Sequence, residues 1–196
     1  VLVCSLIIIM IMGVRQSLGL FLEPISQFMK DGKEFFSFAI GFQAIIWGVV
    51  TFGLGILIDK FGPQKVLAFG IICFASGIFL MSNPANQLTL FSATTLMGFG
   101  LGGAGMATMV SIAGKVAPPE KRSLAMGLIA AAASFGQFAV VLPTMWMNKE
   151  FGWETSLVVL STISISLLLL LPLLNNTNEK NNKKEEFQTS LQNTLL

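Results

Sequence analysis

Six long apolar runs, separated by short polar joints, constrain the fold of this chain more than any other feature. The runs cover residues 2–28, 35–58, 66–81, 88–114, 124–147 and 153–174, and the third is the shortest. A transmembrane helix needs about 20 predominantly apolar residues to cross the hydrocarbon core of a bilayer. We therefore predict an all-α membrane protein with six transmembrane helices, in which the short joints make neighbouring helices antiparallel.

The composition agrees with a lipid-covered surface. Hydrophobic residues make up 54% of the 196 residues and charged residues 11%, against about 25% charged residues in soluble domains. The net charge of +2 gives no reason to expect a nucleic-acid partner. Histidine is absent from the sequence, which excludes histidine-dependent catalytic triads and the usual histidine metal sites. The two cysteines, Cys4 and Cys73, lie in apolar runs and do not suggest a disulfide. We expect no enzyme activity, cofactor or metal.

The sequence divides into two parts. Residues 1–174 are predicted to form the six-helix transmembrane bundle, and residues 175–196 a disordered polar tail or linker. The chain begins with Val1 inside an apolar run and ends in this tail, so we expect a fragment that lacks a carboxy-terminal half.

Basic residues are unevenly distributed between the two sets of joints. One set, together with the tail, carries eight of them: Lys60, Lys65, Lys115, Lys121, Arg122, Lys180, Lys183 and Lys184. The opposite set carries three: Lys30, Lys33 and Lys149. Cytoplasmic loops of membrane proteins carry an excess of Lys and Arg. The bias predicts that the 59–65 loop, the 115–123 loop and the tail are cytoplasmic, and we expect the bacterial inner membrane as the location.

The joint between the second and third runs carries a distinctive pattern, Gly-x-x-x-Asp-Lys-x-Gly-x-x-Lys. Its matching residues are Gly55, Asp59, Lys60, Gly62 and Lys65. The pattern resembles the signature of the major facilitator superfamily, whose members have twelve helices in two halves, each built from 3+3 inverted repeats. The resemblance implies that this chain is the amino-terminal half, and that the loop locks the two halves together on the cytoplasmic side in one state. The alternative is a plain hydrophilic turn with cytoplasmic positive charge.

The opening residues give a narrower resemblance. The stretch Gly13-Val14-Arg15-Gln16-Ser17-x-Gly19-x-Phe21-x-x-Pro24, with Phe36-Ser37 in the second run, is similar to the monocarboxylate and oxalate/formate carrier branch. This implies an organic anion as the substrate. In the fifth run, Val140 and Val141 stand where proton-driven multidrug exporters often carry Gly-Pro, which argues against that class. Sugars and drugs nevertheless stay open as alternative substrates.

Arg15 is the intramembrane cation of the sequence. It lies about 20 Å along the first helix at 1.5 Å per residue, near the middle of the bilayer. An arginine at that depth costs roughly 2.5–3.5 kcal/mol on insertion scales. Because a guanidinium group can hold a carboxylate through two parallel hydrogen bonds, we predict that Arg15 binds an anionic substrate. The alternative is structural pairing with helix carbonyls or with Glu23.

Three further polar or aromatic residues are candidates to line a cavity with Arg15. Gln43 and Trp47 lie one turn apart in the second run, and Gln137 lies in the fifth. Hydrogen bonding between helices is the alternative role for each. Together these residues predict a secondary carrier for a small organic anion that works by alternating access. An intramembrane enzyme is disfavoured because we find no nucleophile with a base and no paired intramembrane acids. A receptor or structural membrane protein is the other alternative.

Overall fold

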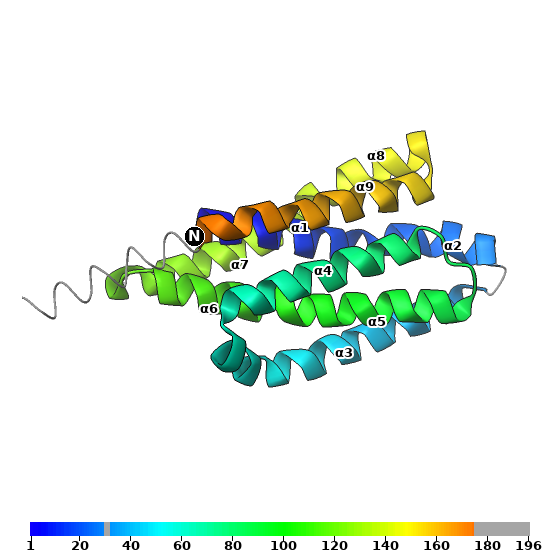
Figure 1. Ribbon diagram of the computed structural model, residues 1–196. Helices are drawn as coiled ribbons and strands as arrows, with labels where there is room; N and C mark the ends of the chain where they lie inside the picture. The colour runs from blue at the N-terminus through cyan, green and yellow to red at the C-terminus, as the bar shows by residue number, and fades with distance from the viewer. Residues whose placement is uncertain (30–31, 175–196) are drawn as a thin grey trace, which may run out of the picture.

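The computed structural model describes residues 1–29 and 32–174, and every regular element within those ranges is helical. These elements form an elongated bundle of roughly parallel and antiparallel helices (Figure 1). Six helical stretches are long and apolar enough to cross a membrane: Leu2–Met29, Lys33–Phe61, Pro63–Met81, Gln87–Val116, Pro119–Phe151 and Trp153–Leu174. The six predicted spans are therefore confirmed in number, order and helical character.

Four of the six spans contain more than one helical element. The first span comprises α1 (Leu2–Ser17), the 3-10 segment η1 (Leu18–Phe21) and α2 (Leu22–Met29), whereas the second and third are the single helices α3 (Gly32–Phe61) and α4 (Pro63–Met81). The fourth comprises α5 (Gln87–Ala104) and α6 (Met106–Val116). The fifth contains η2 (Pro119–Lys121), α7 (Arg122–Ala139) and α8 (Val141–Phe151), and the sixth α9 (Trp153–Ser166) followed by η3 (Leu167–Leu170).

Proline accounts for three of these interruptions. A proline inside a helix has no N–H to donate to the carbonyl four residues earlier, and its ring clashes with that carbonyl. Pro24 lies four residues after Leu20, which belongs to η1. Pro143 lies four residues after Ala139, the last residue of α7. Pro172 lies four residues after Leu168, which belongs to η3. Each span tightens or breaks at that position and then continues. In the fourth span the break falls instead at Gly105, an extended residue between α5 and α6.

Two joints between spans consist of a single glycine. Gly62 separates α3 from α4 and Gly152 separates α8 from α9, and each has a φ of 82°, which disfavours residues with a Cβ. The predicted loop 59–65 is therefore wrong in its extent, because α3 continues through Asp59 to Phe61. Pro63 can begin α4 at once, since the first helical position needs no N–H donor. Hydropathy alone placed these polar residues outside the helices.

The two single-glycine joints occupy equivalent places in a repeat of three spans. Gly62 joins the second and third spans, and Gly152 the fifth and sixth. The packing repeats in the same way, because α1 of the first span packs on α7 of the fifth, and α3 of the second packs on α5 of the fourth. This exchange of partners is the arrangement expected of 3+3 inverted repeats.

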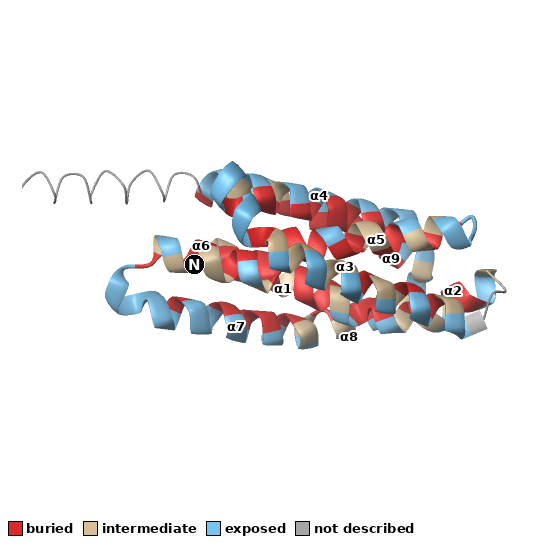
Figure 2. Ribbon diagram, turned by 90° about the horizontal axis from the view of Figure 1, so that it is seen from below, coloured by how far each residue is buried: buried red, intermediate tan, exposed pale blue. Residues whose placement is uncertain are grey.

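Glycines allow both pairs of helices to approach closely. A Cβ on Gly136 of α7 would lie 2.5 Å from the Ile9 Cα of α1. On the other pair, a Cβ on Gly98 of α5 would lie 2.9 Å from the Gln43 carbonyl oxygen of α3. Small residues at such crossings let membrane helices gain van der Waals contact without a hydrophobic driving force. Figure 2 shows the buried residues of α7 along the side that faces the rest of the bundle.

The spans differ widely in how much of them the bundle covers. In the most apolar 18-residue window of each span, 67% of residues are buried in the fourth span but only 11% in the second, which is α3. Several large apolar side chains of α3 are exposed, among them Phe38, Val49 and Phe52. This helix therefore presents most of its length to lipid or to another part of a larger assembly.

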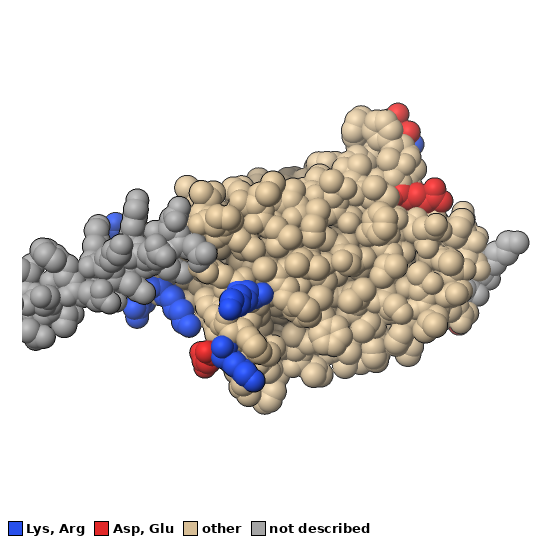
Figure 3. Space-filling model, in the orientation of Figure 1, with Lys and Arg blue, Asp and Glu red and all other residues tan. Residues whose placement is uncertain are grey.

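Two of the joints lie together at one end of the bundle. The α3–α4 joint and the connection from α6 to α7 lie at the same end, with the amino terminus (Figure 1). Lys and Arg side chains gather at this end in Figure 3. The two loops that we predicted to share one side of the membrane thus share one end of the molecule. The predicted tail, residues 175–196, lies outside the described residues.

Candidate substrate-binding cavity

Arg15 and Trp47 meet between α1 and α3. The guanidinium carbon of Arg15 lies 4.7 Å from the centroid of the Trp47 ring, within the range of a cation–π interaction. Both side chains are half-buried. Arg15 belongs to the last turn of α1, which runs directly into the 3-10 segment η1. The indole ring thus stabilises a charge that lipid alone would disfavour.

Gln43 contributes a buried donor to the same region. It lies one turn before Trp47 on α3 and is 3% exposed, and within the described ranges its Nε2 has no hydrogen-bond partner. An unpaired buried polar group costs about 1–3 kcal/mol. A native protein seldom retains such a cost without a ligand, a water or a function that uses the group.

These three residues line one cavity of about 270 Å³. The remaining lining residues are small or apolar: Leu18, Gly19, Ile40, Gly41, Ala44 and Leu101. Sequence reasoning missed this apolar part. Ile40 and Ala44 could have been found, since they lie one turn before Gln43 and Trp47, respectively. Leu101 could not, because it reaches the cavity only through the packing of α5 on α3.

The cavity also lies beside the break in the fourth span. A Cβ built on Gly105 would lie 3.5 Å from Trp47 Nε1. The indole N–H is therefore close to the point where α5 ends and α6 begins. The donors around the cavity are the Arg15 guanidinium, the Gln43 amide and the Trp47 indole, and none of its lining residues is acidic.

Two expected partners lie elsewhere. Gln137 is half-buried on α7 and is not among the residues that line this cavity. Glu23 forms an ion pair with Lys33 and accepts a hydrogen bond from Gln27 Nε2 at 2.8 Å. Pairing of Arg15 with Glu23, the structural alternative, is therefore absent here, and within residues 1–29 and 32–174 the Glu23–Lys33 pair is the ion pair observed.

The five signature residues cluster at the α3–α4 corner. Asp59 and Lys60 lie in the last turn of α3, Lys65 lies in the first turn of α4, and Gly62 is the joint between the two helices. Gly55 lies one turn earlier, and a Cβ on it would meet no atom within 4 Å. Packing inside this bundle therefore explains Gly62 through its backbone, but gives no reason for a glycine at position 55.

Six helices that are long and apolar enough to cross a membrane define a multi-pass integral membrane protein, with a cavity between α1 and α3 that contains Arg15, Gln43 and Trp47. Comparison with known families agrees. Residues 4–195 match the Major Facilitator Superfamily, and the chain belongs to that family of transporters.

Three similar proteins illustrate the range of the family. The chain is 25% identical over 161 residues to the uncharacterized MFS-type transporter YcxA of Bacillus subtilis, covering 79% of this chain and 38% of that protein. It is 28% identical over 127 residues to the agnestins efflux protein AgnL12 of Paecilomyces divaricatus, covering 63% and 27%. It is 28% identical over 167 residues to monocarboxylate transporter 13 of Rattus norvegicus, covering 81% and 37%. The chain thus spans less than two fifths of the length of each of these relatives.

Proposed function

We propose that this chain binds a small organic anion, of the monocarboxylate kind, in the cavity formed by Arg15, Gln43 and Trp47. The observation that carries the proposal is that Arg15 and Trp47 line one cavity with Gln43, whose buried amide N–H has no partner within the described residues. A carboxylate offers acceptor oxygens to Gln43 and the negative charge that would balance Arg15. The apolar residues of the same cavity suit a short hydrocarbon group.

The family supports a transport role for this binding. In our proposal the bundle is the amino-terminal half of a secondary carrier, and a second six-helix bundle covers the open face of α3. Substrate then passes between the two bundles by alternating access. One relative is named a monocarboxylate transporter, which supports an organic anion as the substrate. Another relative, AgnL12, is named an efflux protein, and its name does not point to a monocarboxylate. Gln137 would contact substrate only in a state that brings α7 closer to the cavity.

The signature residues would act on this cycle and not on the substrate. Gly55, Asp59, Lys60, Gly62 and Lys65 lie at one end of the bundle, away from the cavity between α1 and α3. We propose that this end is cytoplasmic and that the segment locks the two bundles together in one state. Open space around Gly55 fits this role, because a second bundle could approach α3 closely at that point.

Anion binding is tested on the reconstituted chain by the fluorescence of Trp47. Trp146 and Trp153 are first replaced by phenylalanine, which leaves Trp47 as the reporter. We expect pyruvate, lactate or benzoate to change its emission in a saturable manner, whereas glucose should have no effect. Arg15→Gln should weaken binding by tenfold or more, since hydrogen bonds to charged groups contribute about 1.5–3 kcal/mol. Arg15→Lys keeps the charge and should retain part of the affinity.

Two results would contradict the proposal. One is glucose or a neutral drug producing the saturable change while the three anions do not. The other is anion affinity unaltered in Arg15→Gln. On a carrier that contains both bundles, Arg15→Gln should also abolish anion uptake into proteoliposomes without lowering the amount of protein inserted.

A further inference from the structure

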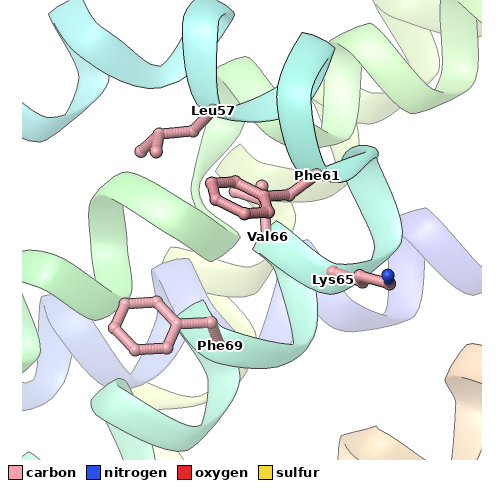
Figure 4. A pocket seen from close by; sticks show the side chains of 5 residues that line it. All are labelled: Leu57, Phe61, Lys65, Val66 and Phe69. Atoms are coloured by element: carbon pink, nitrogen blue, oxygen red, sulfur yellow. The ribbon is translucent and has the colours of Figure 1, made fainter.

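A second cavity lies at the corner between α3 and α4, at the end of the bundle. Its volume is about 350 Å³, and its lining residues are Leu57, Phe61, Lys65, Val66 and Phe69. Figure 4 shows Leu57 and Phe61 of α3 and Phe69 of α4 around the opening, with Val66 close to Phe61. Lys65 lies to one side, and its ammonium group is directed away from Leu57 and Phe69. The cavity therefore has an apolar part and a cationic edge.

The apolar part is open to the surroundings. Leu57, Phe61 and Phe69 are 39%, 49% and 60% exposed, although all three are large hydrophobic side chains. One membrane span ends at Phe61 and the next begins at Pro63, so this corner lies where the hydrocarbon core gives way to the headgroups. The opening thus faces acyl chains on one side and headgroups on the other.

A second cation lies beside Phe61, one of the lining residues. The Nζ atom of Lys60 lies 5.3 Å from the centroid of the Phe61 ring. The neighbouring acid, Asp59, is two residues from both Leu57 and Phe61, and at about 100° per residue it points to the other side of α3. Neither Asp59 nor Lys60 is among the residues that line the cavity. One ammonium group thus lies at the edge of the cavity, and a second lies next to its Phe61 wall.

We propose that this corner binds one anionic phospholipid. Its phosphate lies at the Lys65 edge of the cavity, within reach of the flexible Lys60 side chain beside Phe61, and an acyl chain covers Leu57, Phe61 and Phe69. Basic residues at the membrane surface attract anionic lipid through charge, and burial of the exposed aromatic surface adds an apolar contribution. The lipid would stabilise the α3–α4 corner that carries the signature residues. The site does not depend on which solute the Arg15 cavity binds.

Quenching by brominated lipids tests the proposal on the whole chain reconstituted in vesicles. Trp47, Trp146 and Trp153 are replaced by phenylalanine, and Phe69→Trp provides a reporter in the wall of the cavity. Two matched series of vesicles contain increasing mole fractions of either brominated phosphatidylglycerol or brominated phosphatidylcholine. We expect the anionic lipid to quench the reporter at a lower mole fraction. Lys60→Gln and Lys65→Gln should each reduce this preference by about fivefold at most, whereas Lys65→Arg should keep it.

Phe79→Trp is the matched control. Phe79 lies near the other end of α4 and is 59% exposed, almost the same as Phe69, but does not line this cavity. Both lipids should quench this reporter equally. Native mass spectrometry of the chain with all its tryptophans provides a second measurement. It should retain phosphatidylglycerol in preference to phosphatidylcholine, and Lys60→Gln with Lys65→Gln should remove that preference.

Three results would overturn the proposal. Equal quenching of the residue-69 reporter by both lipids would show that the corner does not select charge. A preference that survives loss of both lysines would place the selective site elsewhere. Quenching by neither lipid would show that no lipid enters the cavity.

Discussion

At the scale of single residues, Arg15 illustrates how the bundle accommodates a charge within a span. The contact of its guanidinium with the Trp47 ring offsets part of the insertion cost. Gln43 is different, because its buried Nε2 gains nothing from the described residues around it. In the protein without ligand, the surroundings thus stabilise the Arg15 side chain but leave the Gln43 amide unpaired. Arg15 has a partner, whereas Gln43 carries a cost that only a ligand or water would remove.

This difference predicts opposite effects of one substitution on stability and on binding. Gln43→Leu has a similar volume and removes the unpaired amide, so the empty bundle should become more stable by about 1 kcal/mol or more. The same substitution should weaken anion binding measured by Trp47 fluorescence. Thermal unfolding in detergent, without and with saturating pyruvate, measures both effects. Loss of stability in the empty protein would instead show that Gln43 has a hydrogen-bond partner.

At the scale of elements, the spans were predictable from sequence but their ends and interruptions were not. Apolar length identifies each span because the bilayer has a fixed thickness. Hydropathy assigns Asp59 and Lys60 to a loop, although a helix can extend into the headgroup layer with its backbone hydrogen bonds intact. The interruptions at Leu20, Ala139 and Leu168 follow from proline four residues later and were available to local reasoning. The break at Gly105 depends on packing.

Close packing of α1 on α7 predicts that two glycines of α7 differ sharply. A Cβ on Gly136 would overlap the backbone of Ile9, so Gly136→Ala should destabilise the bundle by about 1–3 kcal/mol, as overpacking does. Gly127→Ala lies on the same helix, and its Cβ would meet no atom within 4 Å. This control should be neutral or stabilising by up to about 1 kcal/mol, because alanine favours a helix over glycine. Reversible unfolding in mixed detergent micelles measures both.

Equal tolerance of the two alanines would contradict the close contact of α1 with α7. It would also remove one of the two crossings on which the inverted repeat depends. A large loss from Gly127→Ala alone would instead contradict the open space around this residue.

At the scale of the whole molecule, the sequence predicted the order of the spans and the grouping of the joints, but not which helices touch. The pairing of α1 with α7 and of α3 with α5 joins spans that are distant in sequence. A glycine in the sequence indicates that another helix can approach closely, but it does not identify that helix. The sequence around Gly136 therefore did not show that its neighbour is α1. The Arg15–Trp47 contact has the same origin, because it arises only where α1 and α3 converge. The sequence could nominate both residues from their chemistry, but three-dimensional packing was needed to join them.

Accessibility from the two sides of the membrane tests the arrangement of the whole bundle. Lys60 and Lys121 lie at one end of the molecule, and Lys149, near the end of α8, lies at the other; all three are exposed. In a background with Cys4 and Cys73 replaced by alanine, single cysteines at these three positions are labelled with a membrane-impermeant maleimide. In sealed cells the reagent should reach Lys149→Cys but not the other two, because basic joints favour the cytoplasm. After permeabilisation all three should react. Labelling of Lys60→Cys and Lys121→Cys from opposite faces would be incompatible with six spans in this order, whereas labelling of both from outside would keep the fold and reverse its orientation.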